Sequence, residues 1–327
     1  MERLRLKYFD LISGFFMIQI IVMHILQFSA NFDDQIFTVI MRVLFFFMPW
    51  FFFKSGYLYT APRNGLPAYL LDKSKKLLIP FLAFTLIGFV FAFPFELITS
   101  DRSLWRMLLS PLFAMVRWGN GGDGNLPIWF LLSLFFALTG FSLLDKFKLK
   151  VLIILFPLAG YALYYYNIAL PLGLSNVFLG IFFLYAGYIF RNKIEKSKFI
   201  VVFLIACTLI FIASQLFWFS SLDMRINYVT SGNYFVYLIS ALCGLGLIYF
   251  VGKKIDDIKS INYIGENSMV YFVAHWPILL LAKNIMSHFG YETKGYLFAG
   301  ILAITTFVIL PFLIKILNVK MKVLIGK

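Results

Sequence analysis

The sequence predicts an all-α fold, a polytopic transmembrane helical bundle of about ten spans with both termini in the cytoplasm. The 327 residues are 61% hydrophobic and 13% charged, and the mean hydropathy is +0.88, values outside the range of soluble globular domains. The apolar residues gather in runs of about 20 residues, the length that crosses a bilayer as a helix. Alternate loops are basic, which the positive-inside rule assigns to the cytoplasmic face.

Ten apolar runs are candidate spans. The first contains Asp10, Gln19 and His24 and is too long for a signal peptide, so it is interpreted as a retained span. The run at 150–166 is the shortest and contains Pro157, which favours a kinked or partly re-entrant helix. The predicted spans are 8–28, 36–59, 75–97, 126–144, 150–166, 169–190, 198–220, 232–251, 261–283 and 294–317.

No segment between the spans is long enough to form a second, soluble domain. Segment 102–117 mixes three arginines with apolar residues, as an interfacial helix does, and is placed outside the bilayer. The glycine-rich stretch "WGNGGDGNLP" at 118–127 lacks the GxxxxGK[ST] pattern of a phosphate loop and is interpreted as a flexible extracytoplasmic turn. We therefore expect residues 1–327 to form a single integral-membrane domain with no separate soluble domain, multi-pass in the plasma (inner) membrane.

The formal net charge of +14 follows from the topology. Lysine and arginine in the loops set the orientation and attract anionic membrane lipid, so the charge does not indicate nucleic acid as a partner. Cys207 and Cys243 lie in separate apolar runs without a metal-binding spacing, and they are interpreted as small apolar helix residues. The basic loops are at 63–76, 145–150, 191–198 and 253–259.

A polar stripe runs along the first span. At about 100° per residue, Asp10, Ser13, Met17 and His24 fall near a common line, and Gln27 lies close to it. The two ionisable groups at the ends of the stripe are about 21 Å apart along the axis, so they cannot touch. We expect the stripe to line a hydrated cavity that reaches from the cytoplasmic edge toward the outer leaflet.

A second span carries a matching histidine. Ser268, Tyr271 and His275 share one helical face, and by helix rise His275 stands at a depth similar to that of His24. Titratable groups at membrane depth are costly and mark functional sites by default. The alternative is that each histidine only ties neighbouring helices together.

The span at 36–59 adds two cations. Arg42 lies near its outer end and Lys54 near its inner end, with Pro49 between them as a kink or break. We expect Lys54 to pair with Asp10. Arg42 either approaches the histidines or extends to the lipid headgroups.

The blocks that carry these residues resemble those of the membrane-bound acyltransferase family 3, whose members O-acylate surface polysaccharides and related glycans. Two positions depart from the family pattern. Ser13 stands where an arginine often precedes the first-span histidine. Lys73 and Lys76 stand where the family often has two arginines. Lysine keeps the positive charge but lacks the two-pronged guanidinium with which arginine binds phosphate or carboxylate. The blocks are "YFDLISGFFMIQIIVMH" at 8–24, "FFFKSGYLY" at 51–59, "KSKKLLIPF" at 73–81, "IGENSMVYFVAHWPIL" at 264–279 and, more weakly, "PIWFLLSLF" at 127–135.

The resemblance implies a cytoplasmic acyl-CoA donor, acetyl-CoA in the commonest case, a glycan acceptor on the far side, and no metal. A hydroxyl needs a base near neutral pH, and His24 is the suitable group, with Asp10 at the cytoplasmic end of its stripe. His275, Tyr271 or Arg42 would orient the base or stabilise the oxyanion. Direct transfer and a covalent acyl-enzyme are both compatible with these residues. The candidate donor-binding residues are Lys54, Lys73, Lys75, Lys76 and Ser13.

Two other classes of function fit the composition. A transporter or flippase for a glycan or lipid-linked intermediate would also need a polar cavity and intramembrane charges, but the sequence shows no repeated half with paired broken helices. A non-catalytic membrane scaffold or sensor would need no aligned histidine stripe.

Overall fold

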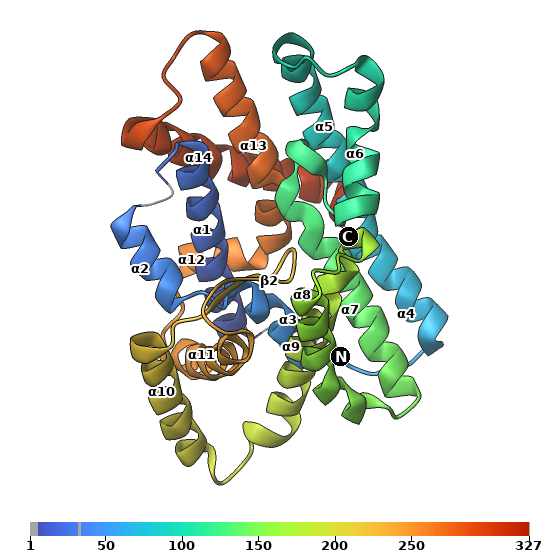
Figure 1. Ribbon diagram of the computed structural model, residues 1–327, viewed down its shortest axis with the longest axis vertical. Coiled ribbons are helices and arrows are strands. Elements are labelled where there is room, and N and C mark those ends of the chain that lie inside the picture. The colour runs from blue at the N-terminus through green and yellow to red at the C-terminus, as the bar shows by residue number, and fades with distance from the viewer. Residues whose placement is uncertain (1–5, 32–33, 327) are drawn as a thin grey trace.

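A computed structural model describes residues 6–31 and 34–326 as a helical bundle with one short β-hairpin. Figure 1 shows α1, α13 and α14 in one half of the bundle and α7, α8 and α9 in the other, with α3 between them. The all-α, polytopic prediction is confirmed. The hairpin, in which β1 pairs antiparallel with β2, lies in a segment predicted only as a loop.

The elements follow in chain order. The first half holds α1 (Lys7–Phe28), α2 (Gln35–Val43), α3 (Phe47–Tyr57), α4 (Gly65–Lys73), α5 (Ile79–Thr99), α6 (Leu104–Trp118) and α7 (Trp129–Lys146). The second half holds α8 (Phe156–Tyr165), α9 (Val177–Ile189), α10 (Ile200–Phe217), β1 (Ser221–Asp223), β2 (Tyr228–Ser231), α11 (Tyr234–Lys254), α12 (Lys259–Glu266), α13 (Ser268–His288) and α14 (Gly295–Lys320). Short 3-10 or π turns occur at Ser74–Leu78, Gly122–Gly124, Leu126–Ile128, Lys150–Leu155, Pro171–Asn176, Phe190–Ile194 and Lys322–Ile325.

Among the described residues, nine helical segments are long and apolar enough to cross a membrane. A shorter apolar helix at Lys150–Tyr165 corresponds to the remaining predicted span. At one end of this shorter helix, Lys150 donates to the Tyr188 hydroxyl near the end of α9. At the other end, the Tyr164 ring stacks on Tyr234 at the start of α11. The segment therefore runs between opposite faces of the bundle.

Three predicted spans differ in their bounds or continuity. The second is broken between α2 and α3, which places Pro49 in the first turn of α3. A proline fits there because the first helical N–H groups need no helical partner. The span predicted from residue 75 begins earlier, at Gly65, and the span predicted at 261–283 is broken at Asn267, between α12 and α13. The segment predicted as interfacial forms α6, which is not one of the nine long apolar segments of the described chain.

Helix α1 is central because its backbone touches that of α12. A Cβ atom on Gly14 would overlap the carbonyl of Ile261, and one on Gly265 would overlap the carbonyl of Asp10. Glycine at both positions lets the two helices approach closely. The rest of α1 packs against α3, α11, α13 and α14.

A cluster around Glu195 joins the ends of α3, α9 and α11. Its carboxylate accepts hydrogen bonds from Tyr249 at 2.6 Å, Tyr57 at 2.7 Å and Lys253 at 2.9 Å. Tyr8 at the start of α1 lies within hydrogen-bond distance of Tyr249, at 3.2 Å. The cluster holds together four chain segments that the charge pattern assigns to the cytoplasmic side.

We predict that Glu195→Ala lowers the free energy of unfolding by about 2–3 kcal/mol, since three donors lose their charged acceptor. Thermal unfolding in detergent, followed by tryptophan fluorescence, measures the change. Exposed Glu292 provides the control, and Glu292→Ala should leave the melting temperature within error. Equal effects of the two substitutions would contradict a structural role for the cluster.

The cluster also predicts a pH dependence of stability. Burial raises the pKa of the Glu195 carboxyl, but the hydrogen bonds from Tyr249, Tyr57 and Lys253 outweigh burial and hold this pKa below its ordinary value of 4.5. A carboxyl with a lowered folded-state pKa contributes stability above its unfolded pKa and loses it as the pH falls through the folded value. The difference in melting temperature between parent and Glu195→Ala should therefore be full at pH 6–7 and shrink below about pH 4.5. A pH-independent difference would contradict this assignment.

Candidate functional site

Two histidine rings stack inside the bundle. The rings of His24 on α1 and His275 on α13 have centroids 5.3 Å apart and an interplanar angle of 21°. Both residues are buried, with 8% and 0% of their surface exposed. The Trp276 ring stands edge-on to His24, with centroids 5.0 Å apart. The two histidines that the sequence places at similar depth are therefore direct neighbours.

The hydrogen bonds of the rings indicate the tautomer of each neutral imidazole. Nδ1 of His275 lies 2.9 Å from the carbonyl oxygen of Tyr271, which can only accept, so Nδ1 carries the hydrogen. In the neutral ring Nε2 then has a free lone pair, and this buried atom has no hydrogen-bond partner in the described structure. Nδ1 of His24 lies 3.2 Å from the side-chain carbonyl oxygen of Gln27. His275 is thus equipped to accept a proton at Nε2.

A polar cluster occupies the other end of the α1 stripe. Lys54 on α3 donates to the Ser13 hydroxyl at 2.8 Å and lies 4.0 Å from the Asp10 carboxylate. Trp50, one turn earlier on α3, donates to the same hydroxyl at 3.2 Å. The ion pair that the sequence predicts between Lys54 and Asp10 is present, and the Ser13 hydroxyl accepts a hydrogen bond from its lysine.

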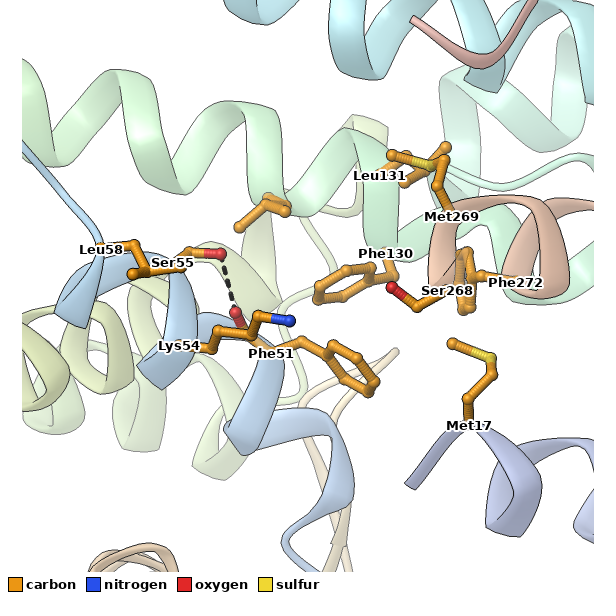
Figure 2. Close-up of a pocket in the computed structure, with 11 residues that line it drawn as sticks. Met17, Phe51, Lys54, Ser55, Leu58, Phe130, Leu131, Ser268, Met269 and Phe272 are labelled. Atoms are coloured by element: carbon orange, nitrogen blue, oxygen red, sulfur yellow. Dashed lines mark hydrogen bonds between the residues drawn. The ribbon is translucent and has the colours of Figure 1, made fainter. Parts of the chain in front are cut away.

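A cavity of about 190 Å³ lies beside this cluster. Figure 2 shows the Lys54 side chain directed toward the rings of Phe51 and Phe130, with Met17 and Phe272 on the opposite wall. Apart from Lys54 and two serines, the lining is apolar. The full lining is Met17, Phe51, Lys54, Ser55, Leu58, Phe130, Leu131, Leu134, Ser268, Met269 and Phe272.

Phe272 lies between the cavity and the histidine pair. Its ring lines the cavity, packs edge-on against Phe130 at 5.5 Å, and lies 6.2 Å from the His275 ring. Of the predicted α1 stripe, Met17 lines this cavity, and the Phe272 ring lies between the cavity and His275. The hydrated cavity expected along the whole stripe stays a prediction.

Other predicted site residues lie elsewhere. Arg42 donates to the carbonyl of Gln215 at 2.8 Å and covers the Phe219 ring, so the structure does not bring it to the histidines. Tyr271 is buried and contributes its main-chain carbonyl to His275.

The predicted basic run lies at the junction of α4 and α5. Lys73 covers the Tyr69 ring and lies 3.6 Å from Asp72, and Lys76 pairs with the same carboxylate at 2.7 Å. Lys75 and Lys76 are exposed, as an anion-binding surface requires. Asp72 offsets part of this positive charge.

Sequence reasoning missed several neighbours of the histidine pair and the stripe. No sequence pattern singles out Trp50 or Trp276, yet their indole N–H groups donate to the Ser13 hydroxyl and to the carbonyl of Asp123. Asn125, fully buried between α5 and α13, was treated as part of a flexible turn. The available signal was an asparagine two residues before the "PIWFL" block, which begins at Pro127. Residues 6–31 and 34–326 contain no group of three or more His, Cys, Asp or Glu side chains placed to hold a metal ion.

Comparison with known protein families identifies the family of the chain. The acyltransferase-3 family model, described as an acyltransferase domain, matches residues 6–316, nearly the whole chain. No curated protein and no solved structure matches the chain.

We predict that Lys54→Met lowers the free energy of unfolding by about 3 kcal/mol, because the buried Asp10 carboxylate loses its neighbouring cation. Asp10→Asn combined with Lys54→Met should recover most of this loss. Ser55→Ala, which removes a hydroxyl bonded to its own helix, is the matched control and should have a small effect. Melting temperatures of the parent, the two single variants Lys54→Met and Asp10→Asn, the double variant and the control test the pair, and strictly additive losses would contradict the coupling.

Proposed function

The chain belongs to this acyltransferase family, and from that membership we propose that it transfers an acyl group, preferably acetyl, from cytoplasmic acyl-CoA to a hydroxyl of an extracytoplasmic or lipid-linked glycan. The family match supports a membrane acyltransferase. The observation that carries the finer proposal is the buried pair of stacked imidazoles, separated by one aromatic ring from a cavity that Lys54 lines. We place the protein in the plasma (inner) membrane, where such an acceptor is available.

The proposed reaction is a general-base acyl transfer. Nε2 of His24 removes the proton of the acceptor hydroxyl as its oxygen attacks the thioester carbonyl. A C–O bond forms, the C–S bond breaks, and the CoA thiolate leaves with the proton that the imidazolium returns. No other reactant is needed for this balance.

The geometry changes the role proposed for His275. As a neutral ring it has no hydrogen on Nε2, because Nδ1–H is bonded to Tyr271, so it cannot donate to an oxyanion. We therefore propose that His275 acts beside His24 as a second proton acceptor. Stacking of the rings places the two imidazoles side by side in the buried interior, so that His275 can share a proton taken by His24 before it passes to the leaving thiolate.

The donor would approach from the side of the basic run. Lys73, Lys75 and Lys76 offer charge for the CoA phosphates, and the cavity accommodates the slender, largely apolar arm that carries the thioester. Lys54 and Ser13 provide the polar contact within it. Phe272 would then separate the bound thioester from the histidines and would have to move for reaction.

We predict that His24→Gln lowers turnover by about two to four orders of magnitude without loss of donor binding, because a proton acceptor is removed. His275→Gln should lower turnover less. His288, exposed at the end of α13, is the third histidine of the chain and the matched control. Turnover, donor binding and melting temperature are measured on the same purified variants. Parental turnover in His24→Gln would refute the proposed base, and lower melting temperatures without a specific rate loss would favour a packing role.

We predict that Lys73→Glu with Lys76→Glu raises the apparent KM for acyl-CoA, and more strongly at low salt, because the lost attraction is electrostatic. Lys196→Glu with Lys198→Glu is the control, since these exposed lysines lie on the same predicted face outside the candidate donor site. Equal donor KM values in both double variants, with topology verified, would remove the basic run from the donor site.

A further inference from the structure

Helix α13 contains a proline two residues after His275. Pro277 has no N–H, so the carbonyl of Val273, four residues earlier, loses its donor within the helix. This carbonyl belongs to the turn whose Tyr271 carbonyl holds the His275 ring. A buried carbonyl without a partner is costly, and movement of this turn would move the imidazole.

Asn125 supplies the missing donor. Its Nδ2 donates to the Val273 carbonyl at 2.9 Å and to the Phe84 carbonyl of α5 at 3.3 Å. The residue is fully buried, and its Oδ1 has no hydrogen-bond partner in the described structure. The amide therefore serves here as a donor that links α5 to α13.

The loop that carries Asn125 is fixed in place. Gly88 of α5 and Gly124 of the loop touch through their backbones, and a Cβ atom on either would overlap the other. The Trp276 indole donates to the Asp123 carbonyl at 3.0 Å, a second bond between this loop and α13. Asn125 thus reaches the proline-freed carbonyl from a backbone that is held on two sides.

We propose that Asn125 is a positioning residue for the histidine pair: it replaces the hydrogen bond that Pro277 removes and so fixes the turn of α13 that presents His275 to His24. The catalytic part of this proposal rests on the proposed function, in which the histidine pair takes part in acyl transfer. Asn125 touches neither imidazole through a hydrogen bond given by the structure, so it acts through the helix backbone.

The test is rescue by a second substitution. Asn125→Ala and the nearly isosteric Asn125→Asp both remove the donor, and each should lower kcat at least about tenfold with the donor KM changed less than twofold. Pro277→Ala restores an N–H within hydrogen-bond reach of the Val273 carbonyl. The double variant Asn125→Ala with Pro277→Ala should therefore regain most of the kcat that Asn125→Ala loses.

A melting-temperature cycle tests the same contact without activity. Asn125→Ala should lower the melting temperature by about 2–4 °C in the parent and by clearly less in the Pro277→Ala background. Asn120→Ala is the matched control, because Asn120 is a buried asparagine of the same loop whose bond to Gly122 stays within the loop. Pro277→Ala should not rescue that variant.

Parental kcat in Asn125→Ala would overturn the proposal, and so would a loss that Pro277→Ala restores neither in kcat nor in melting temperature. Absence of acyl transfer in the parent protein would instead refute the proposed function and the positioning of a catalytic pair with it. The melting-temperature cycle would then still decide whether Asn125 compensates for Pro277, so the two failures are distinguishable.

Discussion

Within a bilayer a buried polar group that lacks a partner inside the protein is costly, because lipid offers none. Helix α1 shows how far this requirement shapes the bundle. Ser13 is bonded by Trp50 and Lys54, and Gln19 donates to the carbonyl of Leu44 at 3.2 Å. The polar residues of α1 thus fix where α3 and the break between α2 and α3 must lie. Apolar packing alone would leave the rotation of α1 much less defined.

The same requirement explains how interruptions of helical hydrogen bonding are tolerated at the α2–α3 break and at Pro277 inside α13. The α2–α3 break exposes the Leu44 carbonyl, and Pro277 frees that of Val273. In each case a side-chain amide from a distant segment, Gln19 or Asn125, supplies the donor. Each interruption therefore becomes a point of attachment between two different helices or loops.

The sequence reveals much of this because helical periodicity depends on local spacing. The stripe on α1 and the common depth of His24 and His275 follow from about 3.6 residues per turn, and the Asp10–Lys54 pair lies where charge and depth suggest. The contacts of Asn125 and Glu195 could not be predicted, because they depend on which helices become neighbours after folding. Arg42 illustrates the limit. Its position along the span allowed a contact with the histidines, yet the orientation of its helix directs the side chain to the carbonyl of Gln215.

The surroundings of the pair also constrain the proposed chemistry. In serine hydrolases a buried carboxylate stabilises the imidazolium that forms during transfer. Here His275 is bonded to a main-chain carbonyl and His24 faces an amide oxygen, while Asp10 belongs to the cluster about 21 Å along the helix axis. A carbonyl orients an imidazole but offsets little positive charge. A proton taken from the acceptor is therefore best passed at once to the departing thiolate, which favours a step in which the pair acts as base and acid in turn. The Asp10 carboxylate is too far from the histidines to stabilise an imidazolium, and the groups that bond the two rings are neutral. Both facts imply that the positive charge on the imidazole must be short-lived.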